Sequence, residues 1–174
     1  MSIPPAEDLA EAPAEAPAEA LDIPLAELTD ADRELIAFAR DVVDANTDGE
    51  EGIHTMGAAV RAVDGTLHAG INVYHFTGGP CAELVALGAA RAAGARELDA
   101  IVAVGNMGRG VVGPCGRDRQ VLLDYHPGIR VILPTTRGVR SVRIEGLMPY
   151  AFAWSPGVGA TAYPSDPVDP VESC

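Results

Sequence analysis

Apolar side chains recur every three or four residues between positions 30 and 45, which predicts an amphipathic helix. Thr29, just before this segment, is a favourable N-cap residue. Asp30 and Asp32 follow in the first turn, where the positive end of the helix dipole favours acidic side chains. We therefore expect the folded part of the chain to open with a helix at Thr29.

Shorter apolar stretches bounded by turn residues predict β-strands. Residues 55–63 and 67–74 flank Asp64-Gly65, a dipeptide that strongly favours a tight hairpin turn. A continuous apolar run over 100–104 is typical of a strand buried on both faces. Two further strands are predicted over 129–133 and 141–144.

Two more helices are predicted between these strands. Residues 81–93 are rich in Ala and Leu, with Pro80 suited to the first turn and Gly94 to the C-terminal end. A third helix is expected over 115–125, after a Gly-Pro pair. The order α-β-β-α-β-α-β indicates an α/β protein, in which one mixed sheet lies between layers of helices.

The two ends of the chain differ in composition from its centre. Residues 1–28 contain seven acidic and no basic side chains, and they include a repeated Pro-Ala-Glu-Ala unit. Prolines interrupt any helix through the repeat, so we expect this segment to be a disordered arm. Residues 155–174, which are acidic and rich in Pro and Gly, are expected to form a flexible tail. A single folded domain over 29–154 remains.

Charge and composition argue against several function classes. The chain has 174 residues, 25 of them acidic and 12 basic, with a formal net charge of −13. This balance argues against binding nucleic acid through a basic surface. No apolar run approaches the ~18 residues that a membrane-spanning helix needs, and the N-terminus lacks the features of a secretion signal. Three cysteines are too few for a disulfide scaffold, so we expect a cytoplasmic protein with no membrane partner.

Two cysteines stand where loops enter the second and third predicted helices. Cys81 is followed by Glu83, and Cys115 is followed one helical turn later by Asp118. Unpaired N–H groups and the positive dipole end at a helix start stabilise thiolates. Cys81, Cys115 and Asp118 together offer three zinc ligands, which leaves a fourth position for water as in catalytic zinc sites. Glu83 is placed to handle protons at that water.

The pattern Cys81-Ala82-Glu83, followed by Pro114-Cys115-Gly116-Arg117-Asp118, is similar to the signature of zinc-dependent nucleobase deaminases, with Asp118 in place of the last cysteine. Longer stretches resemble blasticidin S deaminases, within the cytidine deaminase superfamily. These stretches are 72–84, 105–110, 114–117 and 119–124. The resemblance covers about 30–154, which is the whole predicted domain.

The resemblance implies a three-layer α-β-α sandwich with about five strands, a Zn²⁺ ion at two helix starts, and a homotetramer with active sites near subunit contacts. It also implies hydrolytic deamination of a cytosine ring in a small nucleoside or a nucleoside antibiotic, giving the uracil form and ammonia. Zinc lowers the pKa of its water in such sites. Glu83 would take the water proton and pass protons to the ring and to the departing amine.

Five further residues carry over from the family as candidate substrate-binding groups: Asn72, Tyr74, Ala82, Arg109 and Trp154. Asn72 matches an asparagine that binds the sugar part of the substrate. Tyr74 stands where ordinary cytidine deaminases have a glutamate, and His54 replaces a phenylalanine of those enzymes. Both departures argue against plain cytidine as the preferred substrate. Arg109 and Trp154 match positions near the far end of the substrate in blasticidin S deaminases.

Asp118 leaves three interpretations open. It binds zinc and the enzyme works; it binds zinc but the rate or the substrate has changed; or the domain is a metal-free, degenerate deaminase. In the third case the protein would bind a nucleoside without turnover or assemble with an active relative. Without the resemblance, Asp118 would be an ordinary first-turn acid favoured by the helix dipole. Arg117 and Arg119 are either surface residues or partners that neutralise the thiolates.

Overall fold

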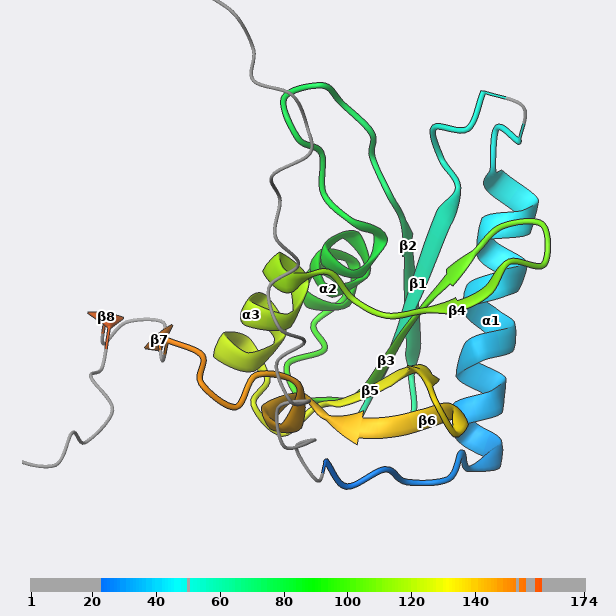
Figure 1. Cartoon of the computed structure of the whole chain (residues 1–174). Helices are drawn as coiled ribbons and strands as arrows, with labels where there is room; N and C mark the ends of the chain where they lie inside the picture. Colours follow the sequence, from blue (N-terminus) through cyan, green and yellow to red (C-terminus); the bar gives the residue numbers. More distant parts are fainter. Residues whose placement is uncertain (1–22, 50, 153, 156–158, 161–174) are drawn as a thin grey trace, which may run out of the picture.

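The computed structural model describes residues 23–49, 51–152, 154–155 and 159–160. In this part of the chain a six-stranded mixed sheet lies between one helix on one face and two helices on the other (Figure 1). The predicted α/β class and the three-layer sandwich are therefore confirmed. None of the helices in the described ranges has the length and apolarity required to span a bilayer.

The helices are α1 (Asp30–Asn46), α2 (Ala82–Ala92) and α3 (Gly116–Tyr125). The strands of the main sheet are β1 (Met56–Ala62), β2 (Leu67–Ile71), β3 (Leu98–Gly105), β4 (Gly110–Val112), β5 (Arg130–Thr135) and β6 (Gly138–Arg143). A short 3-10 helix, η2 (Ile144–Leu147), and a pair of two-residue strands, β7 (Trp154–Ser155) and β8 (Gly159–Ala160), follow.

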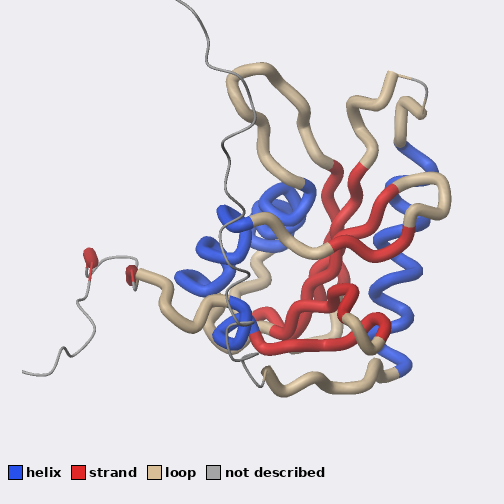
Figure 2. Tube along the Cα trace, viewed as in Figure 1, coloured by secondary structure: helices blue, strands red, loops and turns tan. Residues whose placement is uncertain are grey.

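The strand order in the main sheet is β2-β1-β3-β5-β6, and β4 pairs with β3. All of these pairs are antiparallel except β3 with β5, which is parallel. Figure 2 shows the helices on opposite sides of the strands. The predicted sheet of about five strands gains β4, a segment for which the sequence predicted no strand.

Successive side chains of the central strand point to opposite faces, and they divide the core into two clusters. Ala100 and Val102 of β3 belong to the buried cluster with α1, whereas Ile101 and Ala103 belong to the cluster with α2 and α3. Each helix is therefore anchored to the sheet through its apolar stripe. This packing holds the N-terminal ends of α2 and α3 in place against the sheet.

The approach of α2 to the sheet is especially close at Gly70 of β2. A Cβ atom at this position would lie 2.5 Å from the backbone nitrogen of Ala86 in α2. Only a residue without a side chain leaves room for the helix there. Gly70 thus helps to hold α2, and the residues at its start, against the sheet.

The folded part begins earlier than expected. Residues 23–28, the last six of the predicted disordered arm, lie against the domain: Ala26 pairs with Ser141 of β6, and Ile23 and Leu25 contact the core. Apolar residues at alternating positions explain this packing, which the acidic composition of the arm concealed. Residues 1–22 and 161–174, including Cys174, lie outside the described residues.

The predicted strand over 67–74 is too long at its C-terminal end, because β2 stops at Ile71. The backbone N–H of Asn72 still donates to Met56, but that of Val73 donates to Pro80 instead, closing a loop over 72–80. Gly78, with a φ of +90°, supports this turn. The loop leads from β2 directly to the start of α2.

Candidate active site

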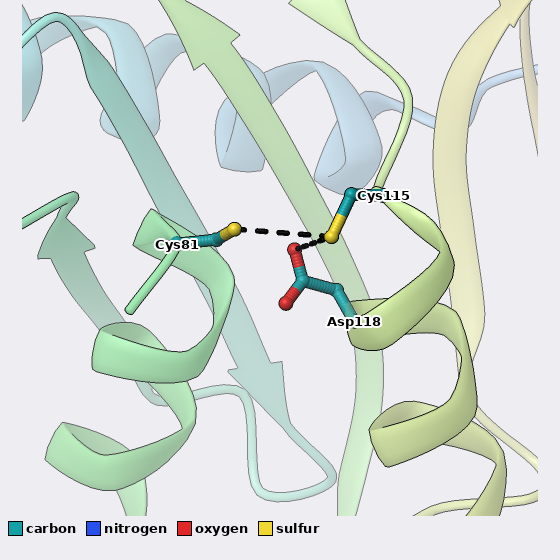
Figure 3. A group of neighbouring side chains, drawn as sticks. All are labelled: Cys81, Cys115 and Asp118. Atoms are coloured by element: carbon teal, nitrogen blue, oxygen red, sulfur yellow. Dashed lines mark hydrogen bonds between the residues drawn. The ribbon is translucent and has the colours of Figure 1, made fainter. Parts of the chain in front are cut away.

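α2 and α3 begin beside each other, and a cysteine occupies the N-cap position of each (Figure 3). The Sγ atoms of Cys81 and Cys115 are 3.9 Å apart. Asp118, in the first turn of α3, accepts a hydrogen bond of 3.2 Å at Oδ2 from the Cys115 thiol. Ligand atoms of the three residues all lie within 4.8 Å of one another. The structure thus brings together the three residues predicted to bind a metal.

Asp118 differs from Asp32, the buried aspartate at the equivalent third position of α1. Asp32 accepts hydrogen bonds from the Thr29 backbone at 3.1 Å and from Arg61 and Arg130 at 3.0 and 3.1 Å. Asp118 is also fully buried, yet its Oδ1 has no hydrogen-bond partner within the described ranges. A buried carboxylate oxygen without a partner carries a high desolvation cost. This environment favours a bound cation and does not fit an ordinary first-turn acid.

The donor atoms also fit zinc by type. Two cysteine sulfurs and one carboxylate oxygen are ligands that zinc accepts, and three protein ligands leave one position for water. Both cysteines are free, and neither side chain makes a hydrogen bond that caps its own helix. The residues at the two helix starts therefore fit a catalytic rather than a closed, structural zinc site.

One guanidinium faces the sulfur atoms. Nη2 of Arg117 lies 3.6 Å from the Cys81 Sγ and donates a hydrogen bond of 3.0 Å to the carbonyl of Gly79. Burial raises the pKa of the Cys81 thiol to about 12, and Asp118 adds to this rise while Arg117 opposes it. Arg119, by contrast, donates to the carbonyl of Pro114 at 3.0 Å. Of the two arginines considered from sequence, Arg117 is the one that contacts a thiol.

Glu83 lies in the first turn of α2 and is only 6% exposed. Burial raises its pKa from the ordinary 4.5 to about 7, and the negative charge of Asp118 contributes to the rise. A carboxyl group with a pKa near neutrality can both accept and return a proton at physiological pH. Glu83 therefore has the properties of a general acid and base beside the three candidate ligands.

A cavity of about 430 Å³ opens over these groups. Seven of the nine residues predicted from sequence to form the site line this cavity: Asn72, Tyr74, Cys81, Ala82, Glu83, Cys115 and Asp118. Its wall also includes Met56, Val112 and Gly113, which the sequence analysis did not single out. Val112 and Gly113 belong to or follow β4, and that short strand was not predicted.

The side chain of Asn72 is already engaged within the chain. Its Oδ1 accepts a hydrogen bond of 2.9 Å from the Met56 backbone, and its Nδ2 donates one of 2.8 Å to the Ile53 carbonyl. The imidazole Nδ1 of His54 lies 2.8 Å from the Asn72 carbonyl. Asn72 thus fixes the segment before β1 against the loop that leads to the site. Tyr74, on the same loop, is 67% exposed at the rim of the cavity.

Arg109 and Trp154 do not lie on this cavity in the chain itself. The guanidinium of Arg109 donates to Asn106 Oδ1 at 2.7 Å and to the carbonyl of Thr55, behind the wall that Met56 forms. The ring of Trp154 packs against Tyr125 at the far end of α3, with 5.7 Å between the ring centroids. Within one chain, the structure therefore separates these two residues from the other predicted site residues.

Known proteins with similar sequences are deaminases. The chain is 31% identical over 112 residues to a blasticidin-S deaminase from Bacillus cereus. The aligned part covers 59% of this chain and 80% of that protein. It is 37% identical over 99 residues to a cytidine deaminase from Mycobacterium tuberculosis, spanning 56% of this chain and 71% of that enzyme. No family model matches the sequence.

Solved structures agree with the sequence relatives. The crystal structure of a cytidine deaminase from Burkholderia pseudomallei superimposes with a TM-score of 0.58 at 32% identity, covering 72% of this chain and all of that one. The cytidine deaminase from M. tuberculosis gives a TM-score of 0.58 at 27% identity, and the superposition covers 70% of this chain and 98% of that one. The chain belongs to the cytidine deaminase superfamily.

Proposed function

We propose that this protein is a zinc-dependent aminohydrolase that converts a cytosine-containing nucleoside, or a nucleoside antibiotic of the blasticidin S type, into its uracil form with release of ammonia. The observation that carries the proposal is the buried, partly unpartnered carboxylate of Asp118 beside Cys81 and Cys115. Glu83, with a pKa near 7, faces the same cavity. The deaminase relatives give independent support.

In this proposal Cys81, Cys115 and Asp118 hold the ion, which when bound lowers the pKa of water toward neutrality. Glu83 accepts a proton from the attacking water and delivers it to N3 of the ring as C4 gains an oxygen. It then takes the proton of the new C4 hydroxyl and passes it to the amino group, so that the C4–N bond breaks, ammonia leaves and C4 becomes a carbonyl carbon. Burial keeps the pKa of Glu83 in the range that both transfers require.

The remaining predicted residues would bind the substrate. Asn72, Tyr74 and Ala82 line the cavity and are assigned to the nucleoside. Arg109 and Trp154 do not reach the cavity of their own chain, so their proposed contact with substrate requires assembly of several copies. We accordingly propose a cytoplasmic homotetramer that acts on free nucleosides rather than on nucleic acid.

Zinc content and ammonia release test this function together. Protein purified without chelator should contain about one zinc per chain by elemental mass spectrometry. Cytidine and blasticidin S are then tested for ammonia release with the wild-type chain and with Glu83→Gln. The variant should keep its zinc and lose about 10²–10⁴-fold in kcat/KM. Glu97→Gln, an exposed glutamate beyond the end of α2, is the matched control and should retain activity.

Two outcomes would overturn the proposal. A chain that takes up no zinc when zinc is supplied has no means of activating water. Equal activity in wild type and Glu83→Gln would remove the assigned proton carrier. Nucleoside binding without zinc or ammonia release would support a nucleoside-binding homologue instead.

A further inference from the structure

We propose that Asp118 sets the metal preference of this site, so that the centre admits harder divalent ions such as Co²⁺ and Fe²⁺ in competition with Zn²⁺. The inference rests on the proposed function only in assigning Cys81, Cys115 and Asp118 to one ion. It concerns which ion the chain selects, and it holds or fails independently of the substrate.

In this proposal Asp118 acts as a metal ligand. Its carboxylate is fully buried, accepts one hydrogen bond from the Cys115 thiol at Oδ2, and leaves Oδ1 without a partner in the described part of the chain. The nearest cationic group, Arg117, keeps its Nε 4.0 Å from Oδ1, which is too long for a hydrogen bond. The unpartnered oxygen belongs to the same three-residue cluster as the two sulfurs.

The type of donor atom affects which ion the site prefers. A thiolate and a carboxylate carry the same formal charge, so the electrostatic attraction for a divalent ion is similar in either case. Soft thiolates favour zinc, whereas carboxylate oxygens suit harder ions. A set of two sulfurs and one oxygen therefore narrows the advantage of Zn²⁺ over Co²⁺ or Fe²⁺ relative to a set of three sulfurs.

The groups around the three ligands also reduce the preference for Zn²⁺. Arg117 directs its Nη2 toward the Cys81 sulfur, and this contact favours the thiolate form while making it a less soft donor, which lowers the advantage of Zn²⁺ over the other ions. Cys115 is exposed and lies on the cavity, so ions from solution have access to the site. The donor set, and not a closed pocket, then decides which ion remains bound.

Competition between cobalt and zinc tests this inference without measuring activity. Metal-free wild-type protein is titrated with Co²⁺ and then with Zn²⁺, and the cobalt–thiolate charge-transfer absorption reports occupancy. The Zn²⁺-over-Co²⁺ affinity ratio should be about tenfold or more lower in the wild type than in Asp118→Cys, which restores a third sulfur. Charge-transfer intensity per cobalt should be about two-thirds of that variant's, in proportion to the number of thiolates.

A second variant, Asp118→Ala, keeps the inference testable if Asp118→Cys does not fold. Asp118→Ala leaves only thiolates as protein ligands, so it should bind both ions more weakly and again show a higher zinc-over-cobalt ratio than wild type. Equal affinities in wild type and Asp118→Ala, or equal ratios in wild type and Asp118→Cys, would overturn the inference while leaving the deaminase proposal intact. If the affinity ratios are as expected but the wild-type protein releases no ammonia, the proposed function is overturned and the inference about the metal stands.

Discussion

Nη2 of Arg117 lies 3.6 Å from the Sγ of Cys81, across the gap between the start of α3 and the start of α2. The same nitrogen donates to the Gly79 carbonyl at 3.0 Å, so one side chain connects the two helix starts. Its guanidinium opposes the rise in the pKa of the Cys81 thiol that burial and Asp118 produce. Arg117 thus favours the thiolate, which is the form that binds metal.

Replacing Arg117 with Gln should therefore weaken zinc binding. Loss of a group that contacts a metal ligand commonly reduces metal affinity by about 10–100-fold, and a value near the lower end fits a half-exposed side chain. Competition with a chromogenic chelator measures the zinc dissociation constant. Arg119→Gln is the control, because Arg119 contacts the Pro114 carbonyl and not a sulfur. Equal losses in both variants would show that the contact with Cys81 is not the cause.

Asp32→Asn should destabilise the fold in a pH-dependent way. Burial alone would raise the pKa of Asp32, but hydrogen bonds from Arg130, Thr29 and Arg61 together lower it from 3.8 to about 2. The ionised carboxylate therefore contributes stability above pH 3.8, and this contribution is lost as the pH falls toward 2. At neutral pH the variant should lose about 3 kcal/mol of unfolding free energy, since the partly buried Arg61 and Arg130 then share Asp99 as their one remaining carboxylate partner in the described residues.

Urea unfolding at two pH values checks this expectation. The difference between wild type and Asp32→Asn should shrink by about 2 kcal/mol between neutral pH and the lowest pH at which both chains fold. Asp30→Asn, in the same turn of α1 but fully exposed, should change the unfolding free energy by less than about 0.5 kcal/mol. A pH-independent loss in Asp32→Asn would contradict the assignment of this stability to the charge.

Asp118→Asn, unlike Asp32→Asn, should not destabilise the metal-free protein. The substitution removes a buried charge whose Oδ1 has no partner in the described ranges, and such a group costs about 1–3 kcal/mol. We expect the unfolding free energy of the metal-free chain to stay level or to rise. Added zinc should then raise the melting temperature of the wild type more than that of the variant. A clear loss of stability in metal-free Asp118→Asn would show that the carboxylate supports the fold by itself.

Gly79→Ala should disturb the loop that carries Cys81. A Cβ atom at Gly79 would lie 1.6 Å from the carbonyl oxygen of Val73, so the loop must move and the Arg117 contact with Gly79 changes. We expect a loss of about 1–3 kcal/mol in unfolding free energy together with weaker zinc binding. Gly88→Ala is the control, because a Cβ there meets no atom within 4 Å inside α2, and it should be neutral or stabilising. Similar losses in the two variants would contradict this explanation.

Local signals in the sequence account for much of the fold. Thr29 caps α1 as expected, and its capping box with Asp32 fixes Asp30 as the first residue of the helix. The predicted hairpin turn at Asp64-Gly65 is confirmed, with Gly65 at a φ of +91° that glycine adopts without strain. These elements could be predicted because each depends on neighbouring residues in the chain.

Features that depend on tertiary packing could not be predicted in this way. β4 has three residues, too few to show a hydrophobic period, and it exists because Val111 and its neighbours pair with β3. Met56 and Val112 reach the cavity only through the arrangement of the sheet. The motif spacing indicated that Asp118 stands near the two cysteines, but only the structure shows that its Oδ1 is buried without a partner.

The short segment before Thr29 has a consequence for the outer edge of the sheet. Ala26 exchanges backbone hydrogen bonds of 2.9 and 3.0 Å with Ser141, in the strand that ends the sheet on that side. A protein trimmed to begin at Thr29, as composition alone suggests, would expose the N–H and C=O groups of Ser141 in the middle of β6. Such an edge is a template for pairing with other chains and promotes aggregation. Ala26 therefore occupies the backbone groups of Ser141 and closes this part of the sheet edge to pairing with another chain.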